Sequence, residues 1–257
     1  MTLTTPTIRA SESNHWYTRD GLPQYTVPSK KDGSPRNTTL RDARTMNLIP
    51  SVTTVLGVCA KPALLAWLQQ QVLLAALTLP RRPDEPEKEY IDRIINDSKE
   101  QGRSAADAGT DIHASIQGYY EGKSTGKHQE SVTACSKAVY DHFAEQDWIS
   151  ERSFAHDLGF GGKCDLFSGD GEGVVIDIKT KEFSDPTKVD GYDEHLMQLS
   201  AYRVGLGIPK ARCANVFVSR SVLNLAVVKE WSAEDLDRGW EMFTHLLYFW
   251  QLKNSHK

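Results

Sequence analysis

The sequence has few cysteines, no long apolar segment and no excess of basic residues, and each absence excludes a class of protein. Its four cysteines lie far apart and form no Cys-x-x-Cys pair, which argues against a zinc ribbon and a disulfide-held secreted domain. The longest mostly apolar stretch, residues 62–80, is interrupted by three consecutive glutamines, so we expect no membrane-spanning segment. Residues 1–13 lack the apolar block of a secretion signal. These features predict a cytoplasmic protein.

The charge balance limits how the chain could bind nucleic acid. Lys and Arg number 30 against 34 Asp and Glu, for a formal net charge of −4. The overall field therefore does not attract a polyanion, and any such contact must come from a local basic patch. Hydrophobic residues make up 39% and charged residues 25%, which is typical of an ordered chain.

The pattern of the chain changes near residue 149. Before this point we expect a short hairpin around the Asp20-Gly21 turn, and then helices. The helices are expected at residues 62–78, 87–120 and 130–146. After this point short strands and two helices follow in the order β-β-β-α-β-β-α. We therefore predict an α/β fold with a mixed central sheet flanked by helices. In it, residues 1–148 form an N-terminal hairpin and helical region packed on a core of residues 149–257, as one integrated domain.

The strongest local signal is an acidic and a basic residue on one strand, VVIDIKT at residues 174–180. Side chains alternate along a strand, so Asp177 and Lys179 share a face. By itself this pattern is more typical of an edge strand with one face exposed to solvent. A hairpin centred on Gly171, however, places Asp165 directly opposite Asp177. Facing carboxylates destabilise a sheet unless one is protonated or a cation lies between them, which predicts a Mg²⁺ or Mn²⁺ site. Lys179 could then orient a water or stabilise charge on a phosphate.

Two helices carry further candidate residues. Gln198 and Tyr202 are four residues apart and share a helical face, with His195 one turn earlier. Such a pair is more often a solvated or half-buried face than part of a site. His113, on the expected long helix, is either structural or exposed, or a nitrogen ligand that completes the carboxylate site and favours manganese.

Taken together, these motifs resemble a known family. They are G-x-x-x-H at residues 109–113, G-G-x-x-D at 161–165, D-I-K at 177–179 and Q-x-x-x-Y at 198–202. Their order and spacing resemble the PD-(D/E)XK nuclease superfamily, and most closely its RecB-type branch with the mitochondrial genome maintenance exonuclease and phage exonucleases. The strand-strand-helix-strand order agrees with the core of that family.

The resemblance implies a set of site residues. It assigns metal binding to His113, Asp165, Asp177 and the carbonyl of Ile178, with Lys179 as the catalytic lysine and Gln198 and Tyr202 as support for the site or the DNA phosphate. Glu151 matches a position that is often acidic in this branch. Ser51 and Thr53, in Pro-Ser-Val-Thr, resemble a segment that could bind a phosphate, although a helix cap explains Ser51 equally well. Arg103 and Lys163 are further candidates for contacts with DNA.

The implied activity is that of a Mg²⁺- or Mn²⁺-dependent DNA exonuclease. It would act on single-stranded ends in recombination, repair or DNA turnover, with a recombination or replication protein as a candidate partner, in a bacterial or phage-infected cell. Two alternatives stay open: a nucleic-acid-binding module that has lost the chemistry, and a restriction-type endonuclease. Several RecB-type relatives hold an iron–sulfur cluster on four cysteines, but only Cys213 follows the helix of Gln198, so we expect no such cluster. The absence of a Walker loop predicts that no nucleotide cofactor is needed.

Overall fold

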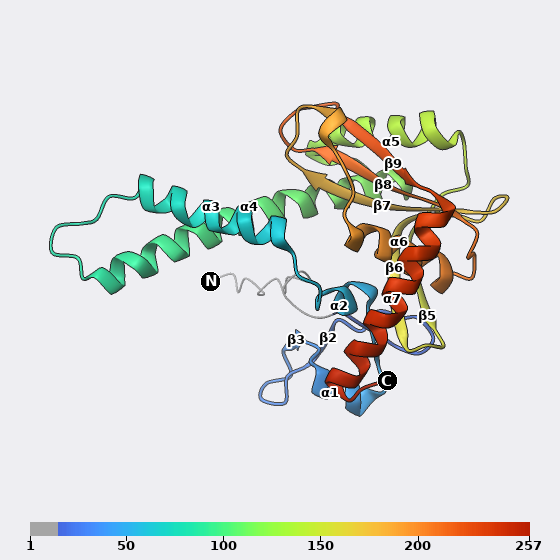
Figure 1. Ribbon diagram of the computed structural model, residues 1–257, viewed down its shortest axis with the longest axis horizontal. Coiled ribbons are helices and arrows are strands. Elements are labelled where there is room, and N and C mark those ends of the chain that lie inside the picture. The colour runs from blue at the N-terminus through green and yellow to red at the C-terminus, as the bar shows by residue number, and fades with distance from the viewer. Residues whose placement is uncertain (1–14) are drawn as a thin grey trace.

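The computed structural model describes residues 15–257, so the expectation for residues 1–13 lies outside the described chain. A five-stranded sheet carries helices on both faces, and a two-helix arm projects from it (Figure 1). The sheet consists of β5 (Ile149–His156), β6 (Phe160–Ser168), β7 (Val174–Lys181), β8 (Arg212–Ser219) and β9 (Ala226–Trp231). The four short strands before it are β1 (Trp16–Tyr17), β2 (Thr26–Pro28), β3 (Pro35–Asn37) and β4 (Ile49–Pro50). The helices are α1 (Leu40–Met46), α2 (Val52–Leu56), α3 (Pro62–Thr78), α4 (Glu87–Tyr120), α5 (Gln129–Phe143), α6 (Asp193–Gly205) and α7 (Ala233–Asn254), with 3₁₀ turns at η2 (Gly126–His128) and η3 (Pro186–Lys188).

The central sheet is mixed, as the sequence predicts. Its strands lie in the order β5-β6-β7-β8-β9. Only β7 and β8 run parallel, and the other neighbours are antiparallel. A parallel pair needs a crossover connection, which α6 supplies between β7 and β8. The predicted order β-β-β-α-β-β-α is confirmed.

The register of β6 against β7 is also the predicted one. Leu166 pairs with Ile176 and Ser168 with Val174, so paired residue numbers sum to 342. Asp165 and Asp177 occupy the next facing position, beyond the last recorded pair. A shift by one residue would have turned one carboxylate to the other face of the sheet.

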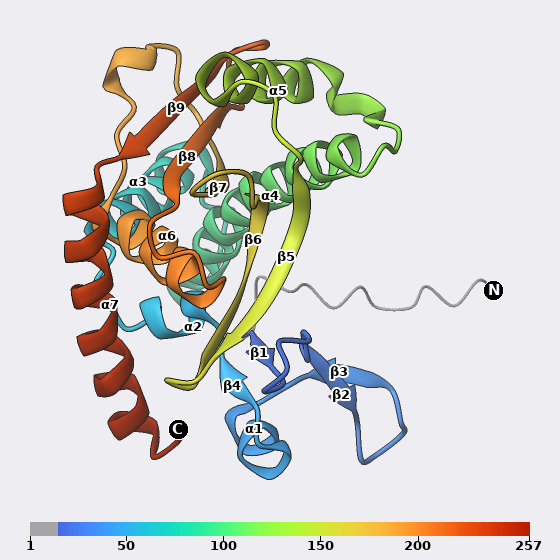
Figure 2. The same cartoon turned by 90° about the vertical axis from the view of Figure 1, so that its right-hand side faces the viewer.

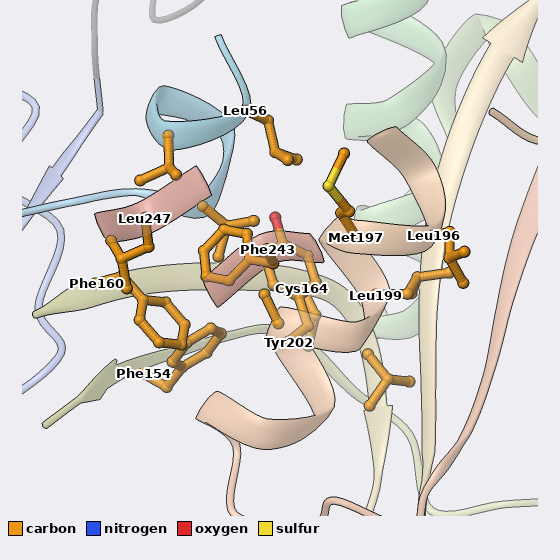
Figure 3. Packing of buried hydrophobic residues seen from close by; sticks show 14 of the residues in the cluster. Leu56, Phe154, Phe160, Cys164, Leu196, Met197, Leu199, Tyr202, Phe243 and Leu247 are labelled. Atoms are coloured by element: carbon orange, nitrogen blue, oxygen red, sulfur yellow. The ribbon is translucent and has the colours of Figure 1, made fainter. Parts of the chain in front are cut away.

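Two hydrophobic clusters bury the two faces of the sheet. The first joins Trp16 and Val52 to Leu196 and Phe243, and much of it packs between α6, α7 and β6 (Figure 3). The second joins α4 and α5 to the opposite face, for example through Ile116, which is fully buried; Figure 2 shows α5 and α4 across the sheet from α7. Each cluster combines side chains from before and after residue 148.

The turn of the predicted N-terminal hairpin is present, but the predicted pairing of its two strands is wrong. The strands β1 and β2 exist, but β1 pairs with β4 and β2 pairs with β3. Across the predicted turn, Tyr17 and Pro23 form an isolated bridge. The N–H of Thr18 also donates to the carbonyl of Leu22 at 2.9 Å, and that of Gln24 to the carbonyl of Trp16 at 2.8 Å. The physical reason is Trp16, which has no exposed surface: pairing with β4 places its side chain in the first cluster, whereas a free two-stranded hairpin would leave it in water.

The helix α3 and the first half of α4 form the projecting arm seen in Figure 1. The helix α3 contains no charged residue, and leucines such as Leu73 and Leu77 are 63% and 84% exposed. At the tip, the guanidinium of Arg93 donates two hydrogen bonds to the carboxylate of Glu85, at 3.0 and 2.9 Å. Among the described residues, no helix has both the length and the hydropathy that crossing a bilayer requires.

Candidate active site

Three acidic residues occupy facing positions on three neighbouring strands. In the β5–β6 pair, Ser150 faces Leu166 and Arg152 faces Cys164, so Glu151 lies opposite Asp165. Asp165 in turn lies opposite Asp177 through the β6–β7 register. The backbone of Glu151 has φ = 55°, a conformation that costs a residue with a side chain about 1–3 kcal/mol and that is concentrated at functional sites. The sheet thus brings together the two aspartates that the hairpin register predicts and Glu151, which only the family resemblance indicated.

His113, Glu151 and Asp165 form a group with the composition of a metal site. Each offers a ligand atom, and the three atoms lie within 4.8 Å of one another. The imidazole Nε2 of His113 is 2.9 Å from Oδ2 of Asp165. Carboxylate oxygens suit Mg²⁺ or Mn²⁺, and an imidazole nitrogen shifts the preference towards Mn²⁺. The donor set therefore fits a hard divalent cation.

Asp177 and Ile178 differ in their contacts from the other predicted ligands. Asp177 does not belong to the group of three. The backbone N–H of Ile178 donates to Oδ2 of Asp165 at 2.5 Å, which fixes the orientation of that carboxylate. Both residues line the same cavity as His113. The predicted ligands are thus gathered in one place, and Glu151 joins His113 and Asp165 more closely than Asp177 does.

A glycine on α4 explains how His113 reaches the sheet. A Cβ atom on Gly109 would lie 2.6 Å from Oγ1 of Thr180 on β7, so a larger residue would require the Thr180 side chain or the helix to shift. One turn later the helix presents His113 to Asp165. Gly162 has a similar role on β6, because an added Cβ would lie 2.7 Å from the ring of Phe154. These motif glycines are therefore explained by packing.

The carboxylate of Asp177 is 2% exposed and is held by three side chains. Lys179 Nζ and Gln198 Nε2 donate to its Oδ1, at 2.9 and 2.8 Å. Asn215 Nδ2 donates to its Oδ2 at 2.8 Å, and Asn215 Oδ1 accepts from the indole of Trp231 at 2.9 Å. The sequence analysis missed Asn215 and Trp231. The available signal was an asparagine inside the otherwise mostly apolar strand 212–219.

The pair on α6 is buried, which excludes the solvated face considered from the sequence. Gln198 and Tyr202 are 6% and 4% exposed. Gln198 Oε1 accepts from Lys179 Nζ at 3.2 Å, while its Nε2 also donates to the hydroxyl of Tyr202 at 2.9 Å. Burial raises the pKa of Tyr202 well above its usual value. The amide thus links Asp177, Lys179 and a neutral phenol.

The charged groups shift one another's pKa values. Burial raises the pKa of Asp177, and the nearby Lys179 offsets this only in part. Burial would also raise the pKa of Asp165, but the charge and hydrogen bond of His113 lower it below its usual value. Asp165 raises the pKa of His113. Burial opposes the charge on Lys179, but Asp177 and Asp165 outweigh it and raise its pKa, so Lys179 is a cation at neutral pH.

Among the residues predicted to contact DNA, Ser51, Thr53 and Lys163 line the cavity and Arg103 does not. Ser51 caps α2, because its Oγ accepts from the N–H of Thr54 at 3.0 Å, and its hydroxyl is 2.9 Å from that of Thr53. Lys163 forms an ion pair with Glu151, and burial lowers its pKa. Arg103 is 57% exposed on α4 near Glu100 and is not among the residues that line the cavity.

One cavity of about 1250 Å³ is lined by Ser51, Thr53 and Lys163 together with the predicted catalytic and metal-binding residues. Its walls come from the ends of β6 and β7, from α6, from α2 and its preceding residue, and from the base of the arm, where Leu64 and Trp67 line it. Pockets for small ligands enclose roughly 300–1,000 Å³. The space is therefore large for a single small molecule and is compatible with a segment of a polymer.

Comparisons with known proteins add little to this description. No family model and no curated protein matches the chain. Among solved structures, SSO0001 is similar with a TM-score of 0.32 and 15% identity, over 71% of this chain and 86% of that one. An alkaline exonuclease, LHK-Exo from Laribacter hongkongensis, is similar with a TM-score of 0.30 and 14% identity, over 48% and 69%. Scores this low leave the question of function to the geometry of the site.

Proposed function

We propose that this protein is a Mg²⁺- or Mn²⁺-dependent deoxyribonuclease of the PD-(D/E)XK type that removes nucleotides from DNA ends. The observation that carries the proposal is the meeting of His113, Asp165, Asp177 and Lys179 in one cavity. Asp177 pairs with Lys179 and Asp165 with His113, at 2.9 Å each, so two carboxylates on neighbouring strands lie beside an imidazole and an amine. Facing carboxylates repel one another, and a divalent cation between them would remove that repulsion.

The ligand set that we propose consists of His113, Asp165, Asp177 and the carbonyl of Ile178, with Glu151 as an additional carboxylate. The bound cation would polarise a phosphate oxygen and lower the pKa of an attacking water. In metal-bound protein, His113 must give up its proton, because only the neutral imidazole can be a ligand.

We assign Lys179 the stabilisation of negative charge rather than the removal of a proton. Its pKa is raised, so at neutral pH it donates hydrogen bonds and does not accept a proton. Gln198 and Asp177 hold its amine at 3.2 and 2.9 Å. This fixed cation can contact a phosphate oxygen that gains charge in the transition state.

We also propose that the arm formed by α3 and the first half of α4 gives the enzyme a preference for single-stranded ends. Its base lines the cavity through Trp67 and Gly102, so a strand entering the site passes beside α3 and α4. We also propose that the two segments on either side of residue 148 act as one unit, since both hydrophobic clusters join them. A cytoplasmic location stays a prediction from the cysteine content and the lack of an apolar segment, and a recombination or replication partner follows only from the family resemblance.

The decisive experiment is digestion of end-labelled single- and double-stranded DNA with Mg²⁺ or Mn²⁺. The variants Lys179→Ala and Asp177→Asn should lower the cleavage rate by a factor of about 100 or more. Lys188→Ala, at a lysine whose side chain is 83% exposed, is the matched control and should cut like the unmodified protein. Equal cleavage by Lys179→Ala would contradict the proposed site.

The same experiment separates the two alternatives from the proposal. A binding module without chemistry would retain DNA and release no labelled nucleotide with either metal. A restriction-type endonuclease would give a ladder of discrete fragments and would cut a closed double-stranded circle. An exonuclease leaves that circle intact.

A further inference from the structure

A cluster of cationic and aromatic side chains lies in the same cavity outside the catalytic group. It consists of Lys181 at the end of β7, Tyr192 and His195 at the start of α6, and Phe217 on β8, and all four line the cavity. The ring of His195 is 5.3 Å from that of Tyr192 and 5.7 Å from that of Phe217, between centroids. The amine of Lys181 is 5.8 and 5.3 Å from the same two rings. The four side chains therefore form one compact group.

The hydrogen bond to His195 determines which ring nitrogen carries its proton. The backbone N–H of Tyr192 donates to Nδ1 of His195 at 3.2 Å, so Nδ1 has no proton in the neutral ring and Nε2 carries the N–H. Burial, with the charges of Lys179, Lys181 and Lys61, lowers the pKa of His195 to about 4. At neutral pH this side chain is thus a fixed, uncharged donor.

The charges around the cluster favour an anion. Within the described residues Lys181 forms no ion pair, because the carboxylates near it have other partners: Asp190 lies 3.2 Å from Lys229 and Glu182 lies 3.7 Å from Arg220. Lys181 and the N–H of His195 are thus donors without an acidic partner. Tyr192 is 49% exposed, so one face of its ring can receive a planar group.

We propose that Lys181, Tyr192 and His195 form a nucleotide subsite next to the catalytic group. A base of single-stranded DNA stacks on Tyr192, and its phosphate accepts hydrogen bonds from the amine of Lys181 and from Nε2 of His195. Phe217, which is 1% exposed, packs against His195 and Lys181. Stacking of this kind tolerates any base but requires that the base be unpaired. The subsite would therefore select single strands without reading their sequence. It rests on the proposed function.

Binding of a fluorescent oligothymidine, measured by anisotropy in EDTA, tests the subsite without any cleavage. Tyr192→Ala should weaken binding roughly 10-fold, while Tyr192→Phe, which keeps the ring, should bind like the unmodified protein. Lys181→Ala should reduce the slope of log K against log salt by about 0.7. His195→Gln, which keeps an N–H donor, should bind more tightly than His195→Ala. A blunt duplex of equal length should show none of these effects.

Two exposed residues away from the cavity provide matched controls. Tyr248→Ala on α7, at a tyrosine that is 64% exposed, and Lys188→Ala should leave the affinity unchanged. The subsite is refuted if Tyr192→Ala binds like Tyr248→Ala, or if the duplex loses affinity equally. Because the assay needs no turnover, it is separate from the nuclease test: a protein that shows these binding effects and cuts no DNA would refute the proposed function alone. If Tyr192→Ala cleaved single-stranded DNA as fast as the unmodified protein, that result would refute the subsite alone.

Discussion

Asn215 offers the sharpest test of how the site is held together, because no sequence motif points to it. Its side chain has no exposed surface and lies between two partners: it donates to Asp177 and accepts from Trp231. The variant Asn215→Ala removes a hydrogen bond to a charged group, worth about 1.5–3 kcal/mol, and leaves the indole N–H without an acceptor, which costs about 1 kcal/mol more at a half-buried site. We therefore expect the free energy of unfolding to fall by roughly 2.5–4 kcal/mol.

Urea denaturation followed by circular dichroism measures this loss. The midpoint should fall while the slope m stays constant, because the surface exposed on unfolding hardly changes. The melting temperature should drop by roughly 5–15 °C at about 2–4 °C per kcal/mol. Asn96→Ala, on the exposed face of α4, is the matched control and should change stability by less than about 0.5 kcal/mol.

A double-mutant cycle with Trp231→Phe separates the two hydrogen bonds. Phenylalanine has no indole N–H to leave unpaired, so the double variant should lose less stability than the two single variants together, by about 0.5–1.5 kcal/mol. If Asn215→Ala were as stable as Asn96→Ala, or if the two losses were strictly additive, this account of the buried network would be refuted.

Three other predictions concern the arm, the crossing of α4 and the metal. Glu85, whose pKa its hydrogen bond with Arg93 lowers to about 2, contributes stability that is present above its unfolded pKa of about 4.3 and is lost as the pH falls towards the folded value. The difference in unfolding free energy between the unmodified protein and Glu85→Gln should thus shrink from pH 6 to pH 3, and a constant difference would speak against the pair. Gly109→Ala should lower the melting temperature because its Cβ would lie 2.6 Å from Oγ1 of Thr180, and Thr180→Ala in the same chain should restore it; an unchanged single variant would show that α4 can shift freely. Mn²⁺ at about 100 times its Kd should raise the free energy of unfolding by about 2.7 kcal/mol, as a thermal melt can show, and Asp165→Asn should abolish most of this gain; an equal gain in both proteins would place the ion elsewhere.

Much of the fold could be predicted because local patterns are strong where they determine backbone structure. Pro62 starts α3 as expected from its fixed φ angle, and the glycine-separated apolar runs after residue 149 became the strands of a mixed sheet. The β6–β7 register followed from the turn alone, since a hairpin centre sets every pair along both strands. The pairing of β1 could not be predicted in the same way, because burial of Trp16 involves β4 and α7, which are distant in sequence.

The residue types of the candidate site were visible in the sequence, but their contacts were not. Asp165, Asp177 and Lys179 stand out because charge on an apolar strand is unusual. The approach of His113 to Asp165 depends on α4 crossing β7 at Gly109, a contact that no local pattern encodes. Tertiary structure alone brings Glu151 next to His113 and Asp165. It also places Asn215 where its amide donates to Asp177. Such contacts form only when strands and helices that are distant in sequence pack together.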